Sequence, residues 1–305
     1  MDAAALEAVV ARVVGSGAAI DRAPGGVSTA VYRVDRGGEV VFVRVAEQPG
    51  GSMAVEAVVH EHLRAIGVAV PEVLALDEGA ELGRGLMILR EMPGRPLVGS
   101  DGVDPTPVLR AAGADLARIN GVEVDGFGWI RRDGPAPPFR GAHASYRAFV
   151  EEGAQGIHGS AASVLDTRQA AVLSILLEAV AAEAPDARLA HGDFDGTHIY
   201  HRAGAYTGLI DLGEMRGAEP WYDLAFALVQ DRSMVSALIA GYREVAPVPS
   251  DLPRRLLRSA TVIVATQLGR WVVRDGPNAL DRPSGRWWAS RLRELVDELG
   301  PDGAA

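Results

Sequence analysis

Hydrophobic residues in the first part of the chain follow a helical spacing and then a strand-like one. Apolar residues between positions 6 and 14 recur at intervals of three or four, which predicts an amphipathic helix. The β-branched runs at residues 27–34 and 40–45 flank a turn at 35–38 that contains two glycines. This order predicts a β-hairpin.

A second helix and two further strands are expected next. Apolar residues at helical spacing predict a helix at 52–66, with Ser52 as its N-cap and Gly67 after its end. Short apolar runs at 73–76 and 86–89 predict two strands. The N-terminal part of the chain is therefore predicted to be rich in β-structure.

The pattern changes after a segment that contains two prolines and a glycine. We interpret residues 91–96 as a linker, because proline removes a ladder donor and Gly94 breaks a strand. Beyond it, helical patterns occur at residues 107–120, 145–152, 166–184, 220–230, 252–273 and 286–299. Only one short β region, around 199–210, interrupts them. The pattern predicts an α+β chain with a small β-rich lobe at 1–92 and a larger helical lobe at 93–305.

Composition excludes several kinds of chemistry. The chain has no Cys and all 30 of its basic residues are Arg, which excludes thiolate nucleophiles, Cys-ligated zinc, lysine Schiff bases and Walker A loops. Its formal net charge is -10, whereas nucleic acids and anionic membranes are bound mainly through excess Lys and Arg. We therefore expect no nucleic acid and no membrane as a partner, and a neutral or cationic small molecule instead.

The N-terminal segment lacks the features of a secretion signal. Glu7 and Arg12 interrupt its apolar stretch, and no basic region precedes that stretch. The longest uncharged stretch of the C-terminal part, residues 259–269, is shorter than the roughly 18 residues of a membrane span. We expect a cytoplasmic protein that is a monomer or a dimer.

The most informative residues are Asp193, in the run His191-Gly192-Asp193, and Asp211. These two carboxylates lie at opposite ends of the β region predicted in the helical lobe. Phosphoryl transfer requires one carboxylate to orient or deprotonate the attacking hydroxyl, and another to hold the magnesium that neutralises the phosphates. Asp193 and Asp211 fit these two roles.

These motifs resemble those of the aminoglycoside and macrolide phosphotransferases, which are antibiotic-modifying relatives of the protein kinases. In that family a His-Gly-Asp catalytic loop is followed after four residues by a metal-binding Asn, where this chain has His198, and a later Ile-Asp motif matches Asp211. The resemblance covers nearly the whole length and implies a bilobal protein-kinase-like fold. It also implies an enzyme that transfers the γ-phosphoryl group of ATP or GTP to an alcohol group of an antibiotic-like acceptor.

The resemblance assigns a nucleotide site to the N-terminal lobe. Gly26, Ser28 and Thr29 lie where the family covers the nucleotide, and a glycine-rich loop can bring backbone N–H groups close to phosphate oxygens. Arg44 stands where kinases place the phosphate-binding Lys, and Glu56 stands where its ion-pair partner belongs. An arginine can bind phosphate through its planar fork.

The resemblance also implies a magnesium site made of His198 and Asp211, with Asp193 orienting the nucleophile. Magnesium prefers hard oxygen ligands, so His198 is expected either to reach the ion through a water or to bind it weakly. Glu214 is either a second metal carboxylate or an ordinary polar residue.

Three further residues are expected to position the nucleotide or the catalytic loop, and a fourth is expected to have a local role. Arg90 and Met92 occupy the hinge of the family, where their backbone would contact the purine. Asp223 follows Pro220 at the start of a helix, which favours a role in capping the helix or bracing the catalytic loop. Asn120, where relatives often carry His, is expected to form local hydrogen bonds.

Three alternatives remain open. His191, His198 and His201, with Asp193, could ligate zinc in a hydrolase, although this leaves the N-terminal nucleotide motifs unexplained. The acceptor could also be a metabolite such as an amino alcohol or a sugar. Finally, the presence of His198 in place of Asn could indicate a nucleotide-binding regulator without catalysis, which the intact Asp193 and Asp211 disfavour.

Overall fold

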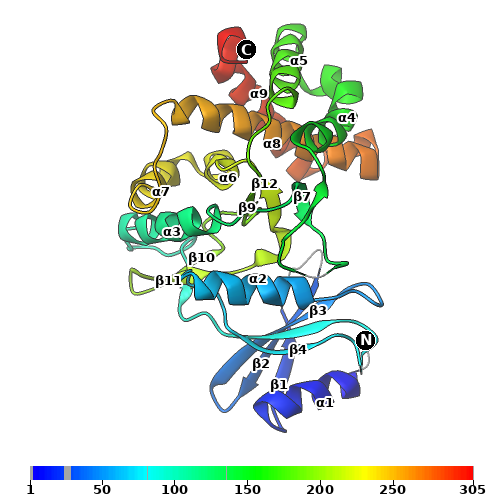
Figure 1. Cartoon of the computed structure of the whole chain (residues 1–305), viewed down its shortest axis with the longest axis vertical. Coiled ribbons are helices and arrows are strands. Elements are labelled where there is room, and N and C mark those ends of the chain that lie inside the picture. The colour runs from blue at the N-terminus through cyan, green and yellow to red at the C-terminus, as the bar shows by residue number, and fades with distance from the viewer. Residues whose placement is uncertain (1–2, 24–28, 81, 135, 305) are drawn as a thin grey trace. The chain divides into compact units, whose positions relative to one another are not determined.

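The β-branched runs of the N-terminal part form an antiparallel five-stranded sheet in the computed structural model of the chain (Figure 1). The strands, in spatial order, are β1 (Ala19–Arg22), β2 (Thr29–Arg36), β3 (Glu39–Ala46), β5 (Leu86–Arg90) and β4 (Val73–Asp77). The predicted hairpin is present as β2 and β3. The hydrophobic pattern does not predict strand β1. Three of its four residues are exposed and Ile20 is only partly buried, so the strand shows no alternation of buried and exposed positions.

The structure describes residues 3–304 apart from 24–28, 81 and 135, and the chain divides into two compact units. The first unit consists of Met1–Val108, Arg131–Pro138 and Gly196–Glu214, and the second of Leu109–Ile130, Phe139–Asp195 and Met215–Ala305.

The α-helices are α1 (Ala3–Val14), α2 (Ala54–Ala65), α3 (Thr106–Ile119), α4 (Tyr146–Val164), α5 (Thr167–Ala181), α6 (Tyr222–Gln230), α7 (Val235–Tyr242), α8 (Leu252–Asp275) and α9 (Pro283–Ala304). The short 3-10 helices η1, η2 and η3 span Leu212–Glu214, Arg232–Met234 and Pro277–Asp281. None of the described helices combines the length and the apolar character that crossing a membrane requires.

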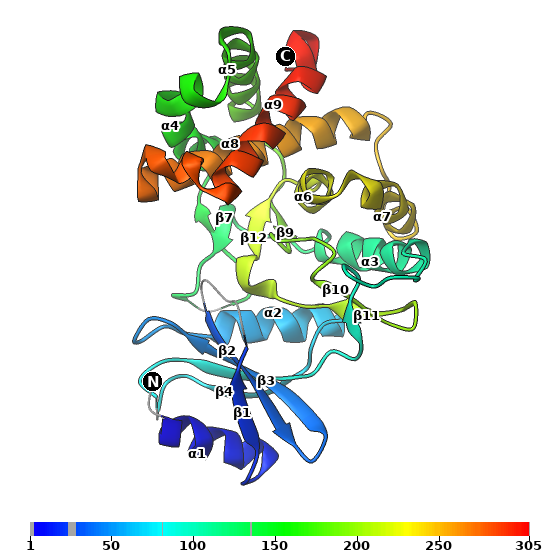
Figure 2. The same cartoon turned by 180° about the vertical axis from the view of Figure 1, so that it is seen from behind.

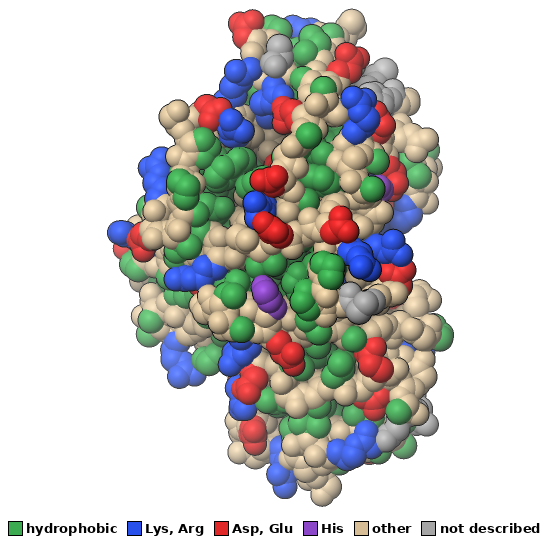
Figure 3. Space-filling model, viewed as in Figure 1, with side chains coloured by type: hydrophobic (Ala, Val, Ile, Leu, Met, Phe, Trp, Pro, Cys, Tyr) green, Lys and Arg blue, Asp and Glu red, His purple; other side chains and the backbone are tan. Residues whose placement is uncertain are grey.

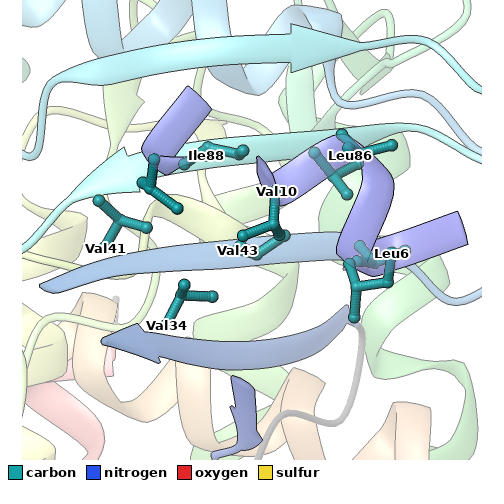
Figure 4. Packing of buried hydrophobic residues seen from close by; sticks show 10 residues of the cluster. Leu6, Val10, Val34, Val41, Val43, Leu86 and Ile88 are labelled. Carbon is teal, nitrogen blue, oxygen red and sulfur yellow. The ribbon is translucent and has the colours of Figure 1, made fainter. Parts of the chain in front are cut away.

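The five-stranded sheet packs against a different helix on each of its faces. Leu86 and Ile88 lie in a buried cluster with side chains of α1, which Figure 4 shows from close by. Met87 and Leu89, the alternate residues of the same strand, lie in a second cluster that includes Ala57 of α2. Figures 1 and 2 show α1 and α2 on opposite sides of the sheet. One strand therefore supplies two cores, because successive side chains of a strand point to opposite faces.

Helix α2 begins two residues later than predicted, at Ala54. Its N-cap position is Met53, whose side chain makes no capping hydrogen bond. The Ser52 hydroxyl accepts from the Ala54 N–H at 3.0 Å and donates to Glu78. The prediction of Ser52 as the N-cap is therefore wrong. The Glu78 carboxylate also accepts from the Met53 N–H at 3.1 Å and so fixes the chain just before the helix.

The linker predicted after the hinge contains a short strand. The three strands of this region are β6 (Arg95–Pro96), β10 (Ile199–Arg202) and β11 (Ala205–Leu209), and β10 lies in the middle. Proline is tolerated because β6 is at the edge of the sheet. Gly94 passes so close to β10 that a Cβ there would lie 2.1 Å from the His201 carbonyl oxygen. A strand of two residues cannot show alternation, which explains why the pattern predicts a linker.

The second unit contains a sheet that the helical pattern of this region does not predict. Its strands, in spatial order, are β8 (Gly141–His143), β7 (Phe127–Ile130), β12 (Arg216–Ala218) and β9 (Arg188–Ala190). The expectation of a single β region beyond the hinge is therefore wrong. Each of these strands has three or four residues, too few for an alternating pattern to be recognised.

The helices of the second unit agree with most of the predicted ones. Helix α5 begins as predicted, with a capping box in which Asp166 accepts from the Gln169 N–H at 2.8 Å and the Gln169 side chain accepts from the Asp166 N–H at 3.2 Å. Helix α4 continues to Val164, well beyond its predicted end at residue 152. Three glycines with low helix propensity follow residue 152 and obscure the helical pattern.

Helices α4 and α8 approach each other through glycines. A Cβ at Gly156 would lie 2.1 Å from the Gly269 carbonyl oxygen, and a Cβ at Gly269 would lie 2.1 Å from the Gly153 carbonyl oxygen. The two helices lie against each other in Figures 1 and 2, and this contact leaves no room for larger side chains. By contrast, a Cβ at Gly159 on α4 would have nothing within 4 Å.

We expect Gly156→Ala to lower the free energy of unfolding by about 1–3 kcal/mol, because the added methyl group forces the backbone of α8 to move. Gly159→Ala on the same helix is the matched control and should be neutral or stabilising by up to about 1 kcal/mol. Urea unfolding followed by circular dichroism measures both variants. Equal stability of the two would contradict the close packing of α4 and α8.

Candidate functional site

A buried carboxylate organises the charged residues of the first unit. Glu56 of α2 is 0 % exposed, and Arg44 of β3 is 7 % exposed. The Arg44 Nε lies 3.0 Å from Glu56 Oε1, an ion pair without the alignment of a hydrogen bond. The Arg44 Nη1 donates to Asp211 Oδ1 at 2.8 Å. The predicted partners Arg44 and Glu56 are therefore brought together, with Asp211 as a third member.

The positive charge of Arg44 is maintained by these two carboxylates. Burial opposes the charge of the guanidinium, but the charges of Glu56 and Asp211 and the hydrogen bond to Asp211 outweigh it, so the pKa of Arg44 is raised. Arg44 and Glu56 are both buried, and removal of one partner of a buried ion pair commonly costs about 3–5 kcal/mol, because the remaining charge is left unpaired. The three residues thus hold one another in place.

Arg132 is a second cation at Glu56, and no sequence pattern indicates it. Its Nη2 lies 3.3 Å from Glu56 Oε2 and donates to the Gly213 carbonyl oxygen at 3.0 Å. A Cβ on Gly213 would lie 2.8 Å from the Arg44 Nη2, so the glycine leaves room for that guanidinium. Arg132 and Glu56 are far apart in sequence, so local periodicity cannot predict their contact.

The two predicted metal ligands lie side by side in the first unit. His198 Nε2 is 3.9 Å from Asp211 Oδ2, and the Ile210 N–H donates to the His198 carbonyl oxygen at 3.0 Å. Asp211 has a φ of 62°, a left-handed conformation that a residue other than glycine adopts only where its surroundings enforce it. Its Oδ1 also accepts from the Gly213 N–H at 3.3 Å.

Asp211 and His198 are placed so that they could share one divalent ion. Ligand atoms about 2.1 Å from a magnesium ion lie within roughly 4 Å of one another, and the 3.9 Å separation meets this condition. The pair offers one carboxylate and one imidazole, so magnesium would receive fewer oxygen ligands from it than it prefers. Glu214 ends the η1 helix that follows Asp211.

The predicted nucleotide-covering loop is described only at its end. Thr29 is the first residue of β2, is buried and pairs with Ala46 of β3. Gly26 and Ser28 lie outside the described residues.

The two predicted hinge residues follow one another closely at the end of β5. The Arg90 N–H donates to the Glu72 carbonyl oxygen at 2.9 Å, and the Arg90 side chain donates to the Glu72 carboxylate at 2.7 Å. Met92 is buried. The course of the chain at the hinge is therefore fixed by one backbone and one side-chain contact.

The His191-Gly192-Asp193 loop of the second unit is held by one buried carboxylate. Asp223 of α6 accepts from the backbone N–H groups of His191 and Gly192, both at 2.9 Å. The Asn120 side chain donates to Asp223 at 3.2 Å and to a backbone carbonyl of β9 at 2.9 Å. The predicted bracing role of Asp223 and the local hydrogen bonding of Asn120 are confirmed.

The backbone of this loop leaves Asp193 partly exposed. Gly192 has a φ of 88°, which a glycine adopts readily and other residues do not. His191 is buried, with its ring edge-on to Phe194 at 5.7 Å. The Asp193 N–H donates to the His191 Nδ1 at 3.4 Å. A half-buried carboxylate on a fixed backbone suits a group that must meet a substrate hydroxyl.

His201 cannot serve as a ligand in the alternative of a zinc site. His201 Nε2 lies 2.8 Å from the Ser100 Oγ, and its Nδ1 accepts from the Gly204 N–H at 3.1 Å. Both ring nitrogens are engaged inside the first unit, so neither is available to a metal ion.

A second buried carboxyl group belongs to Glu219, four residues before Asp223. Glu219 is 9 % exposed. Burial raises the pKa of Glu219 to about 7, since the hydrogen bond from Ser259 that lowers it is outweighed, and the charges of Asp223 and Glu183 raise it further. The folded chain therefore favours the protonated form of this side chain below that value.

The sheet that carries the buried Arg44, the helix that carries its partner Glu56 and the braced His-Gly-Asp loop agree with the predicted protein-kinase-like fold. The sequence model of the phosphotransferase enzyme family (APH) matches residues 19–257. The chain belongs to this family. It is a phosphotransferase.

Solved structures share the predicted α+β protein-kinase-like fold. A thermostable mutant of aminoglycoside phosphotransferase APH(4)-Ia, in ternary complex with AMP-PNP and hygromycin B, has a TM-score of 0.68 at 20 % identity over 96 % of this chain and 98 % of that chain. Macrolide 2′-phosphotransferase MphH from Brachybacterium faecium has a TM-score of 0.61 at 18 % identity, with 95 % and 97 % covered. A fructosamine-3-kinase candidate from Haemophilus somnus 129PT has a TM-score of 0.63 at 13 % identity, with 96 % and 96 % covered. No curated protein sequence matches the chain.

Stability is expected to fall with rising pH because of Glu219. Its pKa of about 7 in the folded chain lies above the ordinary 4.5. The stabilisation that its protonated form provides is therefore complete below pH 4.5 and is lost as the pH rises through about 7. One pKa unit is worth about 1.4 kcal/mol. Between pH 5 and pH 8, the free energy of unfolding of wild type should therefore fall by roughly 2–3 kcal/mol relative to that of Glu219→Gln.

Urea unfolding at these two pH values measures the difference between wild type and Glu219→Gln. Glu151→Gln, at an exposed position of α4, is the control and should show no such change. A difference between wild type and Glu219→Gln that is the same at both pH values would contradict the shifted pKa.

Proposed function

We propose that the enzyme transfers the γ-phosphoryl group of ATP or GTP to a hydroxyl of an antibiotic-like acceptor. The observation that carries this proposal is the joining of Arg44 to both Glu56 and Asp211. Phosphoryl transfer depends on positioned cations and on a metal-holding carboxylate, and this contact joins a cation and a carboxylate that would serve these roles. Residues 1–92 would bind the nucleotide, and residues 93–305 would supply the catalytic residues and the acceptor site.

The nucleotide phosphates would be bound by Arg44 together with the loop residues Gly26, Ser28 and Thr29. Since the Arg44 Nε faces Glu56 and its Nη1 donates to Asp211, Arg44 would offer its remaining nitrogen, Nη2, to a phosphate oxygen. Arg132, which shares the buried carboxylate partner of Arg44, adds a second positive charge to the same unit and would strengthen the attraction of phosphate.

The purine would lie against the backbone of Arg90 and Met92. Support for an adenine nucleotide comes from the APH(4)-Ia mutant, whose ternary complex contains AMP-PNP. The hinge is a suitable surface for a base, because its backbone offers donors and acceptors beside the buried side chain of Met92.

Magnesium would be held by Asp211 and His198. When bound, the ion neutralises the charge of the phosphates during transfer. Asp211 would supply most of the affinity, because a carboxylate oxygen is a harder ligand than an imidazole nitrogen. His198 would contribute a weak direct contact or hold the ion through a water.

Asp193 would orient the acceptor hydroxyl and accept its proton. The hydroxyl oxygen forms a bond to the γ-phosphorus while the bond from that phosphorus to the β–γ bridging oxygen breaks. Asp223 supports this role, because it fixes the backbone N–H groups of the two residues before Asp193. A positioned carboxylate of this kind acts on the acceptor and not on the nucleotide.

We propose a cationic acceptor of the aminoglycoside kind. The APH(4)-Ia complex contains hygromycin B, and a net charge of -10 favours the approach of positively charged molecules. On the face shown in Figure 3, acidic and basic side chains are interspersed, so the attraction comes from the total charge and not from one acidic patch.

A metabolite is the second candidate acceptor. It is supported by the fold shared with the fructosamine-3-kinase candidate, at 13 % identity. A catalytically inactive nucleotide-binding regulator is the third possibility, and the presence of both Asp193 and Asp211 favours an active enzyme over it.

A coupled nucleotide-turnover assay with a panel of acceptors tests the proposed function. Aminoglycosides should stimulate turnover more than macrolides, sugars or carboxylate-bearing metabolites. Asp193→Asn should reduce stimulated turnover by about a hundredfold to ten-thousandfold, because a general base is lost, and should leave nucleotide affinity nearly unchanged. Asp186→Asn, at an exposed position, is the control.

Three outcomes would count against parts of this proposal. Full turnover by Asp193→Asn would remove the catalytic assignment. Stimulation only by acidic acceptors would overturn the cationic preference. Nucleotide binding without turnover for any acceptor would favour the inactive regulator.

His198 should act in the metal site and not only in the hairpin. We expect His198→Ala to raise the magnesium concentration needed for half-maximal turnover and to lower turnover, whereas His198→Asn should keep much of the activity because an amide oxygen suits magnesium. Titration of both variants with magnesium and manganese measures this. Wild-type behaviour of the alanine variant at limiting magnesium would exclude a role in metal binding.

A further inference from the structure

A cavity of about 640 Å³ lies wholly within the second unit. Its wall includes the end of α5, the start of α8, Tyr146 of α4, and Glu219 and Trp221 from the segment before α6. Cavities of about 300–1,000 Å³ commonly hold small molecules. None of the described residues assigned above to phosphoryl transfer lines this cavity.

Two of the three arginines that line this cavity are paired with acids of its rim, and the third, Arg254, is exposed and donates to the Asp302 carbonyl oxygen. Arg258 donates to Glu183 at 2.7 Å, and Arg255 donates to Asp251 at 3.0 Å. Glu219 differs from these acids. Among the residues that the structure describes, no arginine or histidine forms an ion pair with Glu219. The carboxyl group in the wall therefore has no cationic partner in the second unit.

Glu219 sits in a setting that would favour a bound cation. Its side chain is 9 % exposed, and the Ser259 hydroxyl donates to it. A buried carboxylate without a cation is costly, and burial is the main reason that the pKa of Glu219 is raised to about 7. The phenol of Tyr146, also buried, lies within electrostatic reach of Glu219. A cation in the cavity would offset the cost of ionising Glu219.

An aromatic and apolar wall completes the cavity. Trp221 and Pro220 line it, and Trp221 is packed against Tyr242 with their ring centroids 5.8 Å apart. An indole face attracts organic cations, and a proline ring offers apolar surface to a hydrocarbon chain. A cation with a short alkyl chain matches both the carboxyl group and this wall.

We propose that this cavity binds a small alkylammonium ion through an ion pair with Glu219. The ammonium group would donate hydrogen bonds to the carboxylate, and the alkyl chain would lie along Trp221. The site goes beyond the proposed function, because it requires neither the nucleotide nor the metal nor the phosphoryl acceptor.

Isothermal titration calorimetry of the full chain at pH 8 tests this site, with 1,4-diaminobutane as the probe. The neutral and anionic controls are 1,4-butanediol and butyrate. We expect one molecule of the diamine to bind per chain and neither control to bind. Glu219→Gln should weaken binding of the diamine at least about tenfold, a loss of about 1.4 kcal/mol.

Two further variants distinguish binding at Glu219 from binding elsewhere on the chain. Asp186→Asn removes a carboxylate whose side chain is 80 % exposed at the rim of the same cavity, and it should keep the wild-type affinity within about twofold, because exposed charges are well screened. Asp193→Asn should also bind the diamine as wild type does. Should Glu219→Gln fail to fold, Trp221→Leu replaces it and should weaken binding several-fold.

The proposal is overturned if wild type does not bind the diamine, or if Glu219→Gln and wild type bind it equally. Equal weakening by Glu219→Gln and Asp186→Asn would mean a general attraction to the negative chain, and weakening by Asp193→Asn would mean binding at the acceptor site. Either result also overturns it. If Trp221→Leu is the variant used, an unchanged affinity has the same consequence.

Discussion

The burial of the Glu56 carboxylate is the constraint on which the site of the first unit depends. A carboxylate that is out of contact with water must be stabilised by cations or by hydrogen bonds, and at Glu56 the cations are Arg44 and Arg132 from separate parts of the chain. Arg44 then has a fixed direction, so that its second nitrogen reaches Asp211. The positions of Arg44 and Asp211, the residues proposed to bind phosphate and metal, therefore follow from one buried charge.

In the second unit, the buried carboxylate of Asp223 is stabilised by hydrogen bonds and not by cations. Asp223 is paired with backbone N–H groups of His191 and Gly192 and with the Asn120 amide, and no cation is needed for it. Hydrogen bonds from three donors stabilise an ionised carboxylate in a buried position. In return, the carboxylate determines the course of the loop that carries Asp193. Each unit of this phosphotransferase thus positions its reactive groups by the requirements of a single acid.

The sequence predicted features that extend over many residues or that match a family motif. Long helices and the hairpin of β2 and β3 were predictable because their periodicity continues for several turns or alternations. The pairing of Arg44 with Glu56 followed from the kinase-like motif. The strands β7, β8, β9 and β12 were not predictable because each is too short to show a period. Arg132 was not predictable either, because its contact with Glu56 is made between distant parts of the chain.

The fit of Gly213 against the Arg44 guanidinium limits how this chain can change during evolution. Arg44 meets two carboxylates with two different nitrogens, Nε and Nη1, whereas a lysine would have to reach both from a single nitrogen. A side chain at position 213 would displace the guanidinium. A larger residue at position 213 would therefore disturb the contacts of Arg44 with both acids, so that the side chains accepted at positions 44 and 213 depend on each other.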